Sequence, residues 1–251
     1  MGFKKTFRLI RSKGASATYN MALDAKIFSR YLEDGVGVFR LYHWDHPSFT
    51  YGISQHPEDE LDLGLCISKG VGVAKRMTGG GILLHDDEIT YSFVCGKEDI
   101  GEPKNVLISY REICAFLIKF YNSLGLKASF ALSQPDFKDK CMPHSICGAS
   151  YEKYDIVING KKIGGNAQKR ARQAIFQHGS IPCSVDWNFA RGYIRSVPAN
   201  IASNVTTLSR ELTVVPDKQT LETKLIDAFA GQFGVNFKEE SDSFYEAAVV
   251  K

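Results

Sequence analysis

The order of helix-forming and strand-forming segments is the feature that most constrains the fold of this chain. Apolar residues recur at helical spacing in three segments, residues 20–32, 106–124 and 217–232. Gly125 and Gly234 follow the second and third segments, where a glycine commonly ends a helix. Runs rich in β-branched and aromatic residues predict strands at Val36–Trp44, Ser48–Ile53, Val71–Lys75, Thr90–Val94, Tyr154–Ile158 and Ala174–Ile181.

The predicted strands do not alternate regularly with the helices, which argues against a doubly wound parallel sheet. Asn159-Gly160 separates residues 154–158 from 161–163 and predicts a tight hairpin, because a type I′ turn needs two positive φ angles. We therefore predict an α/β (α+β) fold with a mixed, largely antiparallel sheet flanked by helices. Residues 130–150 are predicted to form a long loop.

Length and charge limit the possible classes of function. The 251 residues suit a single catalytic domain, residues 1–251, with a short C-terminal helical segment at 217–251. With 31 Lys+Arg against 28 Asp+Glu, the net charge of +3 is too small to indicate a nucleic-acid partner. No apolar stretch approaches the ~20 residues that a membrane helix needs, and the N-terminus lacks the apolar core of a signal peptide. We expect a cytoplasmic protein that binds neither nucleic acid nor a membrane.

The cysteines do not form a recognisable framework. Six are present, at positions 66, 95, 114, 141, 147 and 183, with no C-x-x-C pair. Cys141, His144 and Cys147 come nearest to a zinc set, but no fourth ligand is evident, so we predict no metal. Most of these thiols are expected to be small buried hydrophobic groups, and one is a candidate nucleophile.

Three blocks carry residues suited to chemistry. The first, residues 75–86, contains Arg76 and the triplet Gly79-Gly80-Gly81. Consecutive glycines let backbone N–H groups face one concavity that suits a carboxylate, a phosphate or a thioester carbonyl. A glycine-rich hairpin or bulge is the alternative. The block matches neither a Walker A loop nor a dinucleotide fingerprint.

The second and third blocks each allow a functional and a purely structural interpretation. Lys162 lies beside the glycine pair Gly164-Gly165, where a lysine can hold an anion or stabilise an oxyanion, or can belong to a solvated basic hairpin. His178 interrupts a strand pattern within residues 176–181. Taken alone, it also suits a hydrogen-bonded structural histidine.

Together, in this order, the three blocks resemble the lipoate–protein ligase and octanoyltransferase family of the biotin/lipoyl protein ligase superfamily. The matching motifs are Arg76–Gly81 with His85-Asp86, Lys162-Ile163-x-Gly165-x-Ala167-Gln168, and Gln177–Ser180. Weaker matches occur at Asn20–Asp24 and from Phe39–Tyr42 through Gly52-x-x-Gln55. The resemblance implies a mixed α/β fold with an acyl tunnel beside the glycine loop and Lys162 at the acyl carbonyl. It also implies substrate contacts at Arg76, Thr78, Gly79, Gly80, Gly81, His85, Gly165, Asn166, Ala167, His178, Gly179 and Ser180.

The family resembled here uses two chemistries. Its ligases activate free lipoate with ATP and magnesium, through an adenylate. Its octanoyltransferases need no cofactor and take octanoate from acyl carrier protein through a cysteine thioester. In both, the acceptor is a lysine of a lipoyl domain, either in the glycine cleavage H protein or in the E2 component of a 2-oxoacid dehydrogenase.

Three features favour the transferase. Cys147 lies fifteen residues before Lys162, where one octanoyltransferase branch carries its nucleophile, and a nearby cation would stabilise its thiolate. Residues 88–92 resemble the Glu-x-Thr-Tyr-Ser of that branch. Only 68 residues follow Cys183, whereas single-chain ligases carry a further C-terminal domain.

Three positions depart from the pattern that the chain resembles. Gly81 completes a triplet typical of ligases, whereas the transferase branch often has a larger residue there. Asn166 stands where serine is common, and Lys75 stands where arginine is common. We predict octanoyl transfer through a Cys147 thioester, with Lys162 stabilising the thiolate and the oxyanion. An ATP-dependent lipoate–protein ligase is the alternative.

Overall fold

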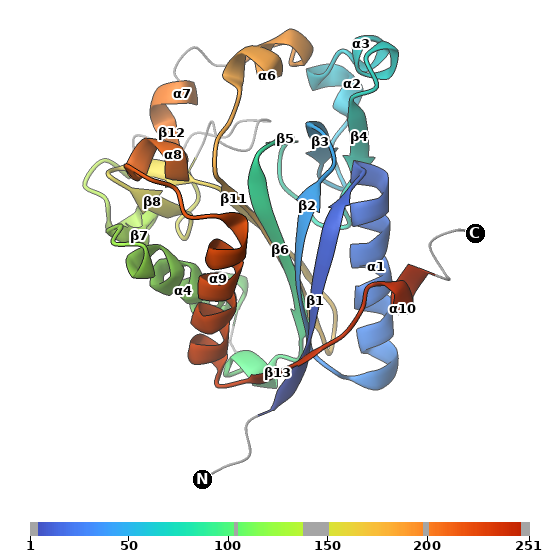
Figure 1. Ribbon diagram of the computed structural model, residues 1–251, viewed down its shortest axis with the longest axis vertical. Coiled ribbons are helices and arrows are strands. Elements are labelled where there is room, and N and C mark those ends of the chain that lie inside the picture. Colours follow the sequence, from blue (N-terminus) through green and yellow to red (C-terminus); the bar gives the residue numbers. More distant parts are fainter. Residues whose placement is uncertain (1–4, 103–104, 138–150, 198–200, 247–251) are drawn as a thin grey trace.

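A computed structural model describes residues 5–102, 105–137, 151–197 and 201–246. Its largest sheet has the strand order β10-β11-β6-β2-β1-β13 (Figure 1). The strands are β1 (Thr6–Ala15), β2 (Val38–Trp44), β6 (Glu88–Cys95), β10 (Gly165–Arg170), β11 (Ile175–Pro182) and β13 (Asn236–Glu239). Neighbours from β10 to β2 pair antiparallel, and β2-β1 and β1-β13 pair parallel. The predicted mixed, largely antiparallel sheet is therefore confirmed.

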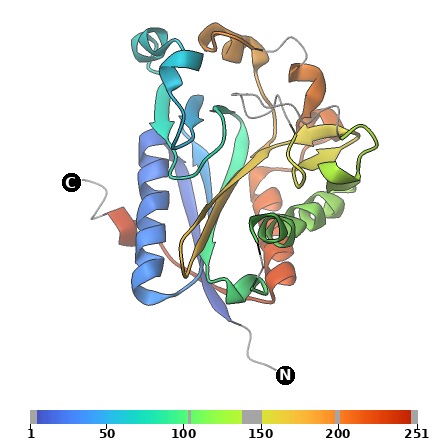
Figure 2. The same ribbon diagram turned by 180° about the vertical axis from the view of Figure 1, so that it is seen from behind.

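Two smaller sheets lie beside one end of the large sheet (Figures 1 and 2). One has the order β12-β9-β8-β7 and the other β4-β3-β5. Their strands are β3 (Ser48–Tyr51), β4 (Gly72–Lys75), β5 (Leu83–His85), β7 (Ala128–Phe130), β8 (Ile156–Ile158), β9 (Lys161–Ile163) and β12 (Val205–Thr206). Asn159 and Gly160 have φ angles of 50° and 71°, which confirms the predicted tight hairpin between β8 and β9.

Three long helices cover the two faces of the large sheet: α1 (Ala17–Asp34) on one side, and α4 (Val106–Ser123) and α9 (Lys218–Phe233) on the other (Figure 1). All three were predicted, and each begins at a side chain that caps a backbone N–H: Ser16, Asn105 and Asp217. The short helices are α2 (Pro57–Glu60), α3 (Leu63–Ser68), α6 (Trp187–Tyr193), α7 (Ile201–Asn204), α8 (Leu208–Glu211) and α10 (Ser243–Glu246), with 3-10 turns at Glu98–Ile100 and Ala131–Ser133.

Aromatic side chains fill the layer between the sheet and α4 with α9. The rings of Phe39 and Phe229 stack with centroids 4.2 Å apart, and Phe116 meets Phe39 edge-on. The opposite layer, under α1, packs Leu23 and Ile27 against the other sheet face. Burying each such side chain contributes about 1.5–3 kcal/mol, so both layers hold the sheet firmly.

Six strands were not predicted. Three of them, β5, β7 and β12, have only two or three residues, and the other three, β1, β10 and β13, are rich in charged or polar residues. In β1, Arg8 forms ion pairs with Asp34 at 2.8 Å and with Glu240 at 3.1 Å, while the neighbouring Phe7 and Leu9 are buried. Tertiary partners for the charges therefore allow a strand that local pattern does not indicate. The predicted loop 130–150 begins with the turn Ala131–Ser133, and residues 138–150 lie outside the described part of the chain.

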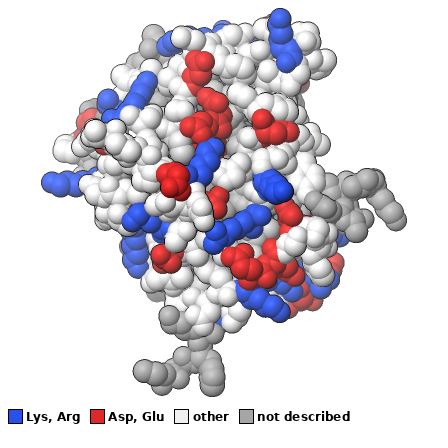
Figure 3. Space-filling model, viewed as in Figure 1, with Lys and Arg blue, Asp and Glu red and all other residues white. Residues whose placement is uncertain are grey.

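The described residues include no helix that is long and apolar enough to cross a membrane. On the face shown in Figure 3, acidic and basic side chains are interspersed. This mixing agrees with the small net charge of +3.

Candidate functional site

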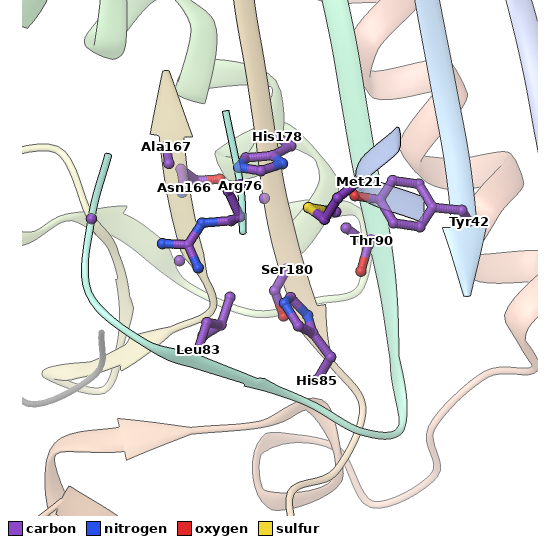
Figure 4. A pocket seen from close by; sticks show the side chains of 13 residues that line it. Met21, Tyr42, Arg76, Leu83, His85, Thr90, Asn166, Ala167, His178 and Ser180 are labelled. Carbon is purple, nitrogen blue, oxygen red and sulfur yellow. The ribbon is translucent and has the colours of Figure 1, made fainter. Parts of the chain in front are cut away.

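A cavity opens between the glycine loop, helix α1 and strands β6, β10 and β11. Its open volume, which includes space continuous with solvent, is about 390 Å³, and its walls are mainly apolar. It is lined by Met21, Tyr42, Arg76, Gly80, Leu83, His85, Thr90, Gly165, Asn166, Ala167, His178, Gly179 and Ser180. Figure 4 shows these side chains arranged around one common space, with His178 on one side and His85 and Ser180 on the other.

The glycine loop between β4 and β5 is held by the buried guanidinium of Arg76. Its Nη2 donates to the carbonyl oxygens of Gly79 at 3.2 Å and Gly81 at 2.7 Å. Gly80 has a φ of 95°, and a Cβ at Gly52 would collide with the Gly80 carbonyl. The loop therefore needs a glycine both at its turn and at the position packed against it.

A buried chain of hydrogen bonds continues from Arg76 away from the loop. Arg76 Nη1 donates to Thr50 Oγ1 at 2.8 Å, which lies 2.7 Å from His85 Nε2. His85 Nδ1 lies 2.8 Å from Glu88 Oε1, and Ser180 Oγ donates to Glu88 Oε2 at 2.6 Å. Burial raises the pKa of Glu88, but His85 and the hydroxyl donors hold it below its ordinary value.

A second buried chain reaches the loop from helix α1. His178 Nε2 lies 2.8 Å from Thr78 Oγ1, and His178 Nδ1 lies 3.5 Å from Asp24 Oδ2. Asp24 pairs with Arg40 at 2.8 Å, and both side chains are buried. Although burial raises the pKa of Asp24, the Arg40 charge lowers it below its ordinary value. Burial also lowers the pKa of His178, despite the opposing effect of Asp24.

Asn166 forms the wall that faces helix α4. Tyr91 Oη donates to Asn166 Oδ1 at 2.6 Å, and Tyr110 Oη donates to its carbonyl oxygen at 2.8 Å. A Cβ at Gly179 would collide with Asn166 Oδ1, so the glycine lets the asparagine side chain lie against β11. The amide therefore takes a defined position beside the cavity.

Lys162 lies outside the cavity wall, on β9. Its Nζ lies 2.7 Å from Asp155 Oδ2, and both side chains are buried. Asp155 lines a neighbouring groove that shares Gly80, Asn166 and Ala167 with the cavity. The buried Lys162–Asp155 pair therefore borders this neighbouring groove rather than the cavity.

Cys147, the predicted nucleophile, lies outside the described residues, as do Cys141 and His144. The four described cysteines are buried free thiols, at positions 66, 95, 114 and 183. Burial raises the pKa of Cys114 and of Cys183 to about 12. These two thiols are therefore poor nucleophiles, because the thiolate is the reactive form. Within the described ranges, no three His, Cys, Asp or Glu residues are grouped to hold a metal ion.

Most of the residues predicted to contact substrate meet at this cavity. The exceptions are Thr78, which lies behind the wall against His178, Gly79, which lines the neighbouring groove, and Gly81, whose carbonyl faces Arg76. Sequence reasoning did not select four of the lining residues, Met21, Tyr42, Leu83 and Thr90. All four lie inside segments that had been noted, Leu83 in the block of residues 75–86, but none was selected as a substrate contact.

Comparisons with known proteins agree with the motif pattern. Residues 16–230 match the model of the lipoyl protein ligase A/B catalytic domain. An octanoyltransferase LipM from Bacillus cereus is 30% identical and aligns over 95% of this chain and 87% of its own length. An octanoyltransferase LipM from Kyrpidia tusciae is 36% identical over 72% of this chain and 68% of its own length.

The similar solved structures share the fold. A lipoate-protein ligase A bound with ATP has a TM-score of 0.78 at 21% identity, covering 99% of this chain and 95% of the other. A bipartite lipoate protein ligase from Thermoplasma acidophilum, studied with its E2 lipoyl domain, has a TM-score of 0.75 at 20% identity, covering 98% and 93%. The chain therefore belongs to the lipoyl protein ligase A/B catalytic-domain family and is an enzyme of that family.

Proposed function

We propose that this enzyme transfers an octanoyl group from acyl carrier protein to a lysine of a lipoyl-domain protein, through a thioester on Cys147. The main support is the apolar cavity, which gathers residues of all three motif blocks. Relatives aligned over most of the chain are octanoyltransferases. An eight-carbon chain suits walls that are mainly apolar.

The proposed reaction has two steps, acylation of Cys147 and transfer of the acyl group to the acceptor lysine. The Cys147 thiolate attacks the donor carbonyl, a bond forms to Cys147 sulfur, and the carrier-protein thiolate leaves and takes up a proton. The neutral amine of the acceptor lysine then attacks the new thioester. The amide forms, the Cys147 thiolate leaves, and the proton lost by the amine passes to solvent, which balances the proton taken up by the carrier-protein thiolate. No ATP is consumed, because the donor thioester already carries an activated acyl group.

We assign Lys162 as the cation that assists both steps. A charged ammonium stabilises both a thiolate and the oxyanion of a tetrahedral intermediate. Asp155, at 2.7 Å, orients that ammonium in a buried place. The acceptor is proposed to be the lipoyl domain of the glycine cleavage H protein or of a 2-oxoacid dehydrogenase E2. A related ligase has been studied with such an E2 lipoyl domain.

The proposal is tested by incubating the protein with octanoyl-acyl carrier protein, without ATP, and measuring intact mass. We expect an octanoyl adduct that disappears in Cys147→Ser and persists in the matched control Cys141→Ser. Acceptor modification that requires ATP and survives Cys147→Ser would instead establish a lipoate–protein ligase, which uses ATP, magnesium and lipoate.

A second test concerns Lys162. We expect Lys162→Ala to slow acceptor octanoylation by about 10²–10³-fold, the range measured for loss of an oxyanion-stabilising donor. Lys161→Ala is the matched control, because Lys161 is adjacent and exposed. Equal rates for the two variants would exclude Lys162 from the reaction.

A further inference from the structure

Asn166 carries a side-chain donor group in the cavity wall that has no partner among the residues that the structure describes. The other polar side chains of that wall already have protein partners. They are Tyr42, Arg76, His85, Thr90, His178 and Ser180. Asn166 differs from them, because its Nδ2 donates to no atom of the described residues.

The amide nitrogen of Asn166 is also accessible. Gln168 Oε1 and Arg170 Nη1 are buried atoms without a partner, and Asn166 Nδ2 is not one of these buried atoms. Asn166 lines both the cavity and the neighbouring groove. Its N–H groups can therefore donate to a ligand without breaking a hydrogen bond within the described protein.

A directed chain of hydrogen bonds determines which end of the amide a ligand meets. Gln168 Nε2 donates to Gln177 Oε1 at 2.7 Å, and Gln177 Nε2 donates to Tyr91 Oη at 2.7 Å. Tyr91 Oη in turn donates to Asn166 Oδ1 at 2.6 Å. The oxygen end of the amide is thereby occupied, and the nitrogen end is left for a ligand.

Burial preserves the direction of this chain. The side chains of Tyr91 and Gln177 are buried, and burial raises the pKa of Tyr91 well above its ordinary value. The phenol therefore keeps its proton and continues to donate to Asn166. The amide is oriented before a substrate binds, which is the arrangement expected of a preorganised donor.

We propose that Asn166 Nδ2 donates a hydrogen bond to the acyl carbonyl oxygen, with Tyr91 and Gln177 as positioning residues. This inference rests on the proposed function and deepens it. The carbonyl oxygen is the one polar acceptor of an octanoyl group, and the walls around Asn166 are mainly apolar. In the proposed reaction, the carbonyl must also be reached by Lys162, whose partner Asp155 lines the groove. Asn166 lines both spaces.

The hydrogen bond would strengthen as the carbonyl oxygen becomes an oxyanion in each tetrahedral intermediate, because a charged acceptor binds an N–H more strongly. The N–H keeps its proton throughout. Asn166 would therefore share the stabilisation of the oxyanion with the Lys162 ammonium and would change no other part of the two proposed steps.

The test is acylation of Asn166→Asp by octanoyl-acyl carrier protein, followed by intact mass at about pH 8, where an accessible carboxyl is ionised. Aspartate keeps the shape and still accepts from Tyr91, but it replaces the N–H groups by a carboxylate oxygen. We expect the rate at saturating donor to fall by about 10²-fold or more, with KM changed by less than about threefold. Asn188→Ala, on the exposed side of α6, is the control. A rate in Asn166→Asp equal to that of the control would overturn the proposal.

Infrared spectra of the acyl-enzyme, isotope-labelled at the octanoyl carbonyl, separate a lost hydrogen bond from a packing defect. Asn166→Asp should move the C=O band to higher wavenumber, and an unmoved band would overturn the proposal. Tyr91→Phe should lower the rate at saturating donor by about tenfold, the effect of one ordinary hydrogen bond. Tyr110→Phe should have a smaller effect, because Tyr110 donates to the backbone carbonyl of Asn166. Equal effects of the two tyrosine variants would overturn the positioning role of Tyr91.

The proposed function fails separately, in the unchanged protein. If that protein forms no acyl-enzyme and modifies the acceptor only with ATP, the thioester mechanism is wrong. Asn166→Asp is then measured in the ATP-dependent reaction at saturating lipoate. A loss of rate there would retain Asn166 as the donor to the acyl carbonyl, and an unchanged rate would overturn that role as well.

Discussion

Two buried carboxylates hold the glycine loop from opposite directions, and they are stabilised differently. Asp24 pairs with the permanent charge of Arg40 at 2.8 Å and accepts from Tyr42 and Ser92. Glu88 accepts from the Trp44 indole and the Ser180 hydroxyl, and it contacts His85. Both carboxyls have a lowered pKa and therefore remain charged.

The two carboxylates therefore have different roles: Asp24 stabilises the fold, and Glu88 stabilises the walls of the cavities. Asp24 joins helix α1 to the large sheet and contacts the loop through His178 and Thr78. Glu88 lines a second cavity, which shares Leu83 and Ser180 with the first, so its partner Ser180 lines both cavities. Changes at Asp24 should therefore act mainly on folding, whereas changes at Glu88 should also act on substrate binding.

The largest expected effect is that of Asp24→Ala. Removing the carboxylate leaves Arg40 charged and buried, which should destabilise the fold by about 3–5 kcal/mol. Urea denaturation measures the free energy of unfolding. The control is Glu33→Ala, because Glu33 forms an exposed ion pair with Arg30 that should contribute about 1 kcal/mol or less. Similar losses in the two variants would contradict the scaffold role of Asp24.

Glu88→Gln tests the role of the second buried carboxylate. The variant keeps the shape of the side chain but loses charge-assisted hydrogen bonds, so we expect a smaller loss of stability, about 1.5–3 kcal/mol. It should also raise KM for the acyl donor, because the amide disturbs Ser180 between the two cavities. An unchanged KM, together with a loss of stability as large as that of Asp24→Ala, would show that Glu88 and Asp24 have the same structural role.

Two matched threonine variants compare the two hydrogen bonds, Thr50 with Arg76 and Thr78 with His178, that help to hold the glycine loop. Thr50→Val removes a hydrogen bond from the charged Arg76, and should destabilise by about 1.5–3 kcal/mol. Thr78→Val removes a contact with neutral His178, and should destabilise by about 0.5–1.5 kcal/mol. Thermal or urea unfolding of both proteins measures the order. The reverse order would mean that the His178 link carries more of the stability of the loop.

The smallest effect is a pH dependence caused by His178. Its folded-state pKa is lowered, so as the pH falls below about 6.5 the unfolded chain takes up the proton first and stability declines. His178→Gln should remove this contribution, at most about 1.4 kcal/mol per pH unit, between about pH 6.5 and 5. Urea denaturation at several pH values measures it, and identical slopes in both proteins would contradict it. The losses linked to the Asp24 and Glu88 carboxyls belong below about pH 4.

The local sequence pattern predicted those helices and turns whose conformation depends mainly on neighbouring residues. Helices α1, α4 and α9 follow from apolar periodicity and their capping residues, and the β8–β9 hairpin follows from Asn159-Gly160. Strands β1, β10 and β13 of the large sheet were not predicted, because they are rich in charged and polar residues, and the short strands β5, β7 and β12 were also not predicted. Arg8 in β1, for example, pairs with Asp34 and Glu240.

The sequence by itself determined the family and most of the residues around the cavity, because motif residues and their spacing can be read along the chain. Only the tertiary structure decided how these residues are held. The Thr78–His178 contact joins residues 100 positions apart, and the Ser92–Asp24 hydrogen bond spans 68. The tertiary structure also revealed that Lys162 pairs with Asp155 and that a second cavity lies beside the first. Such contacts depend on how sheets and helices pack, and no local pattern encodes which buried donor will meet which acceptor.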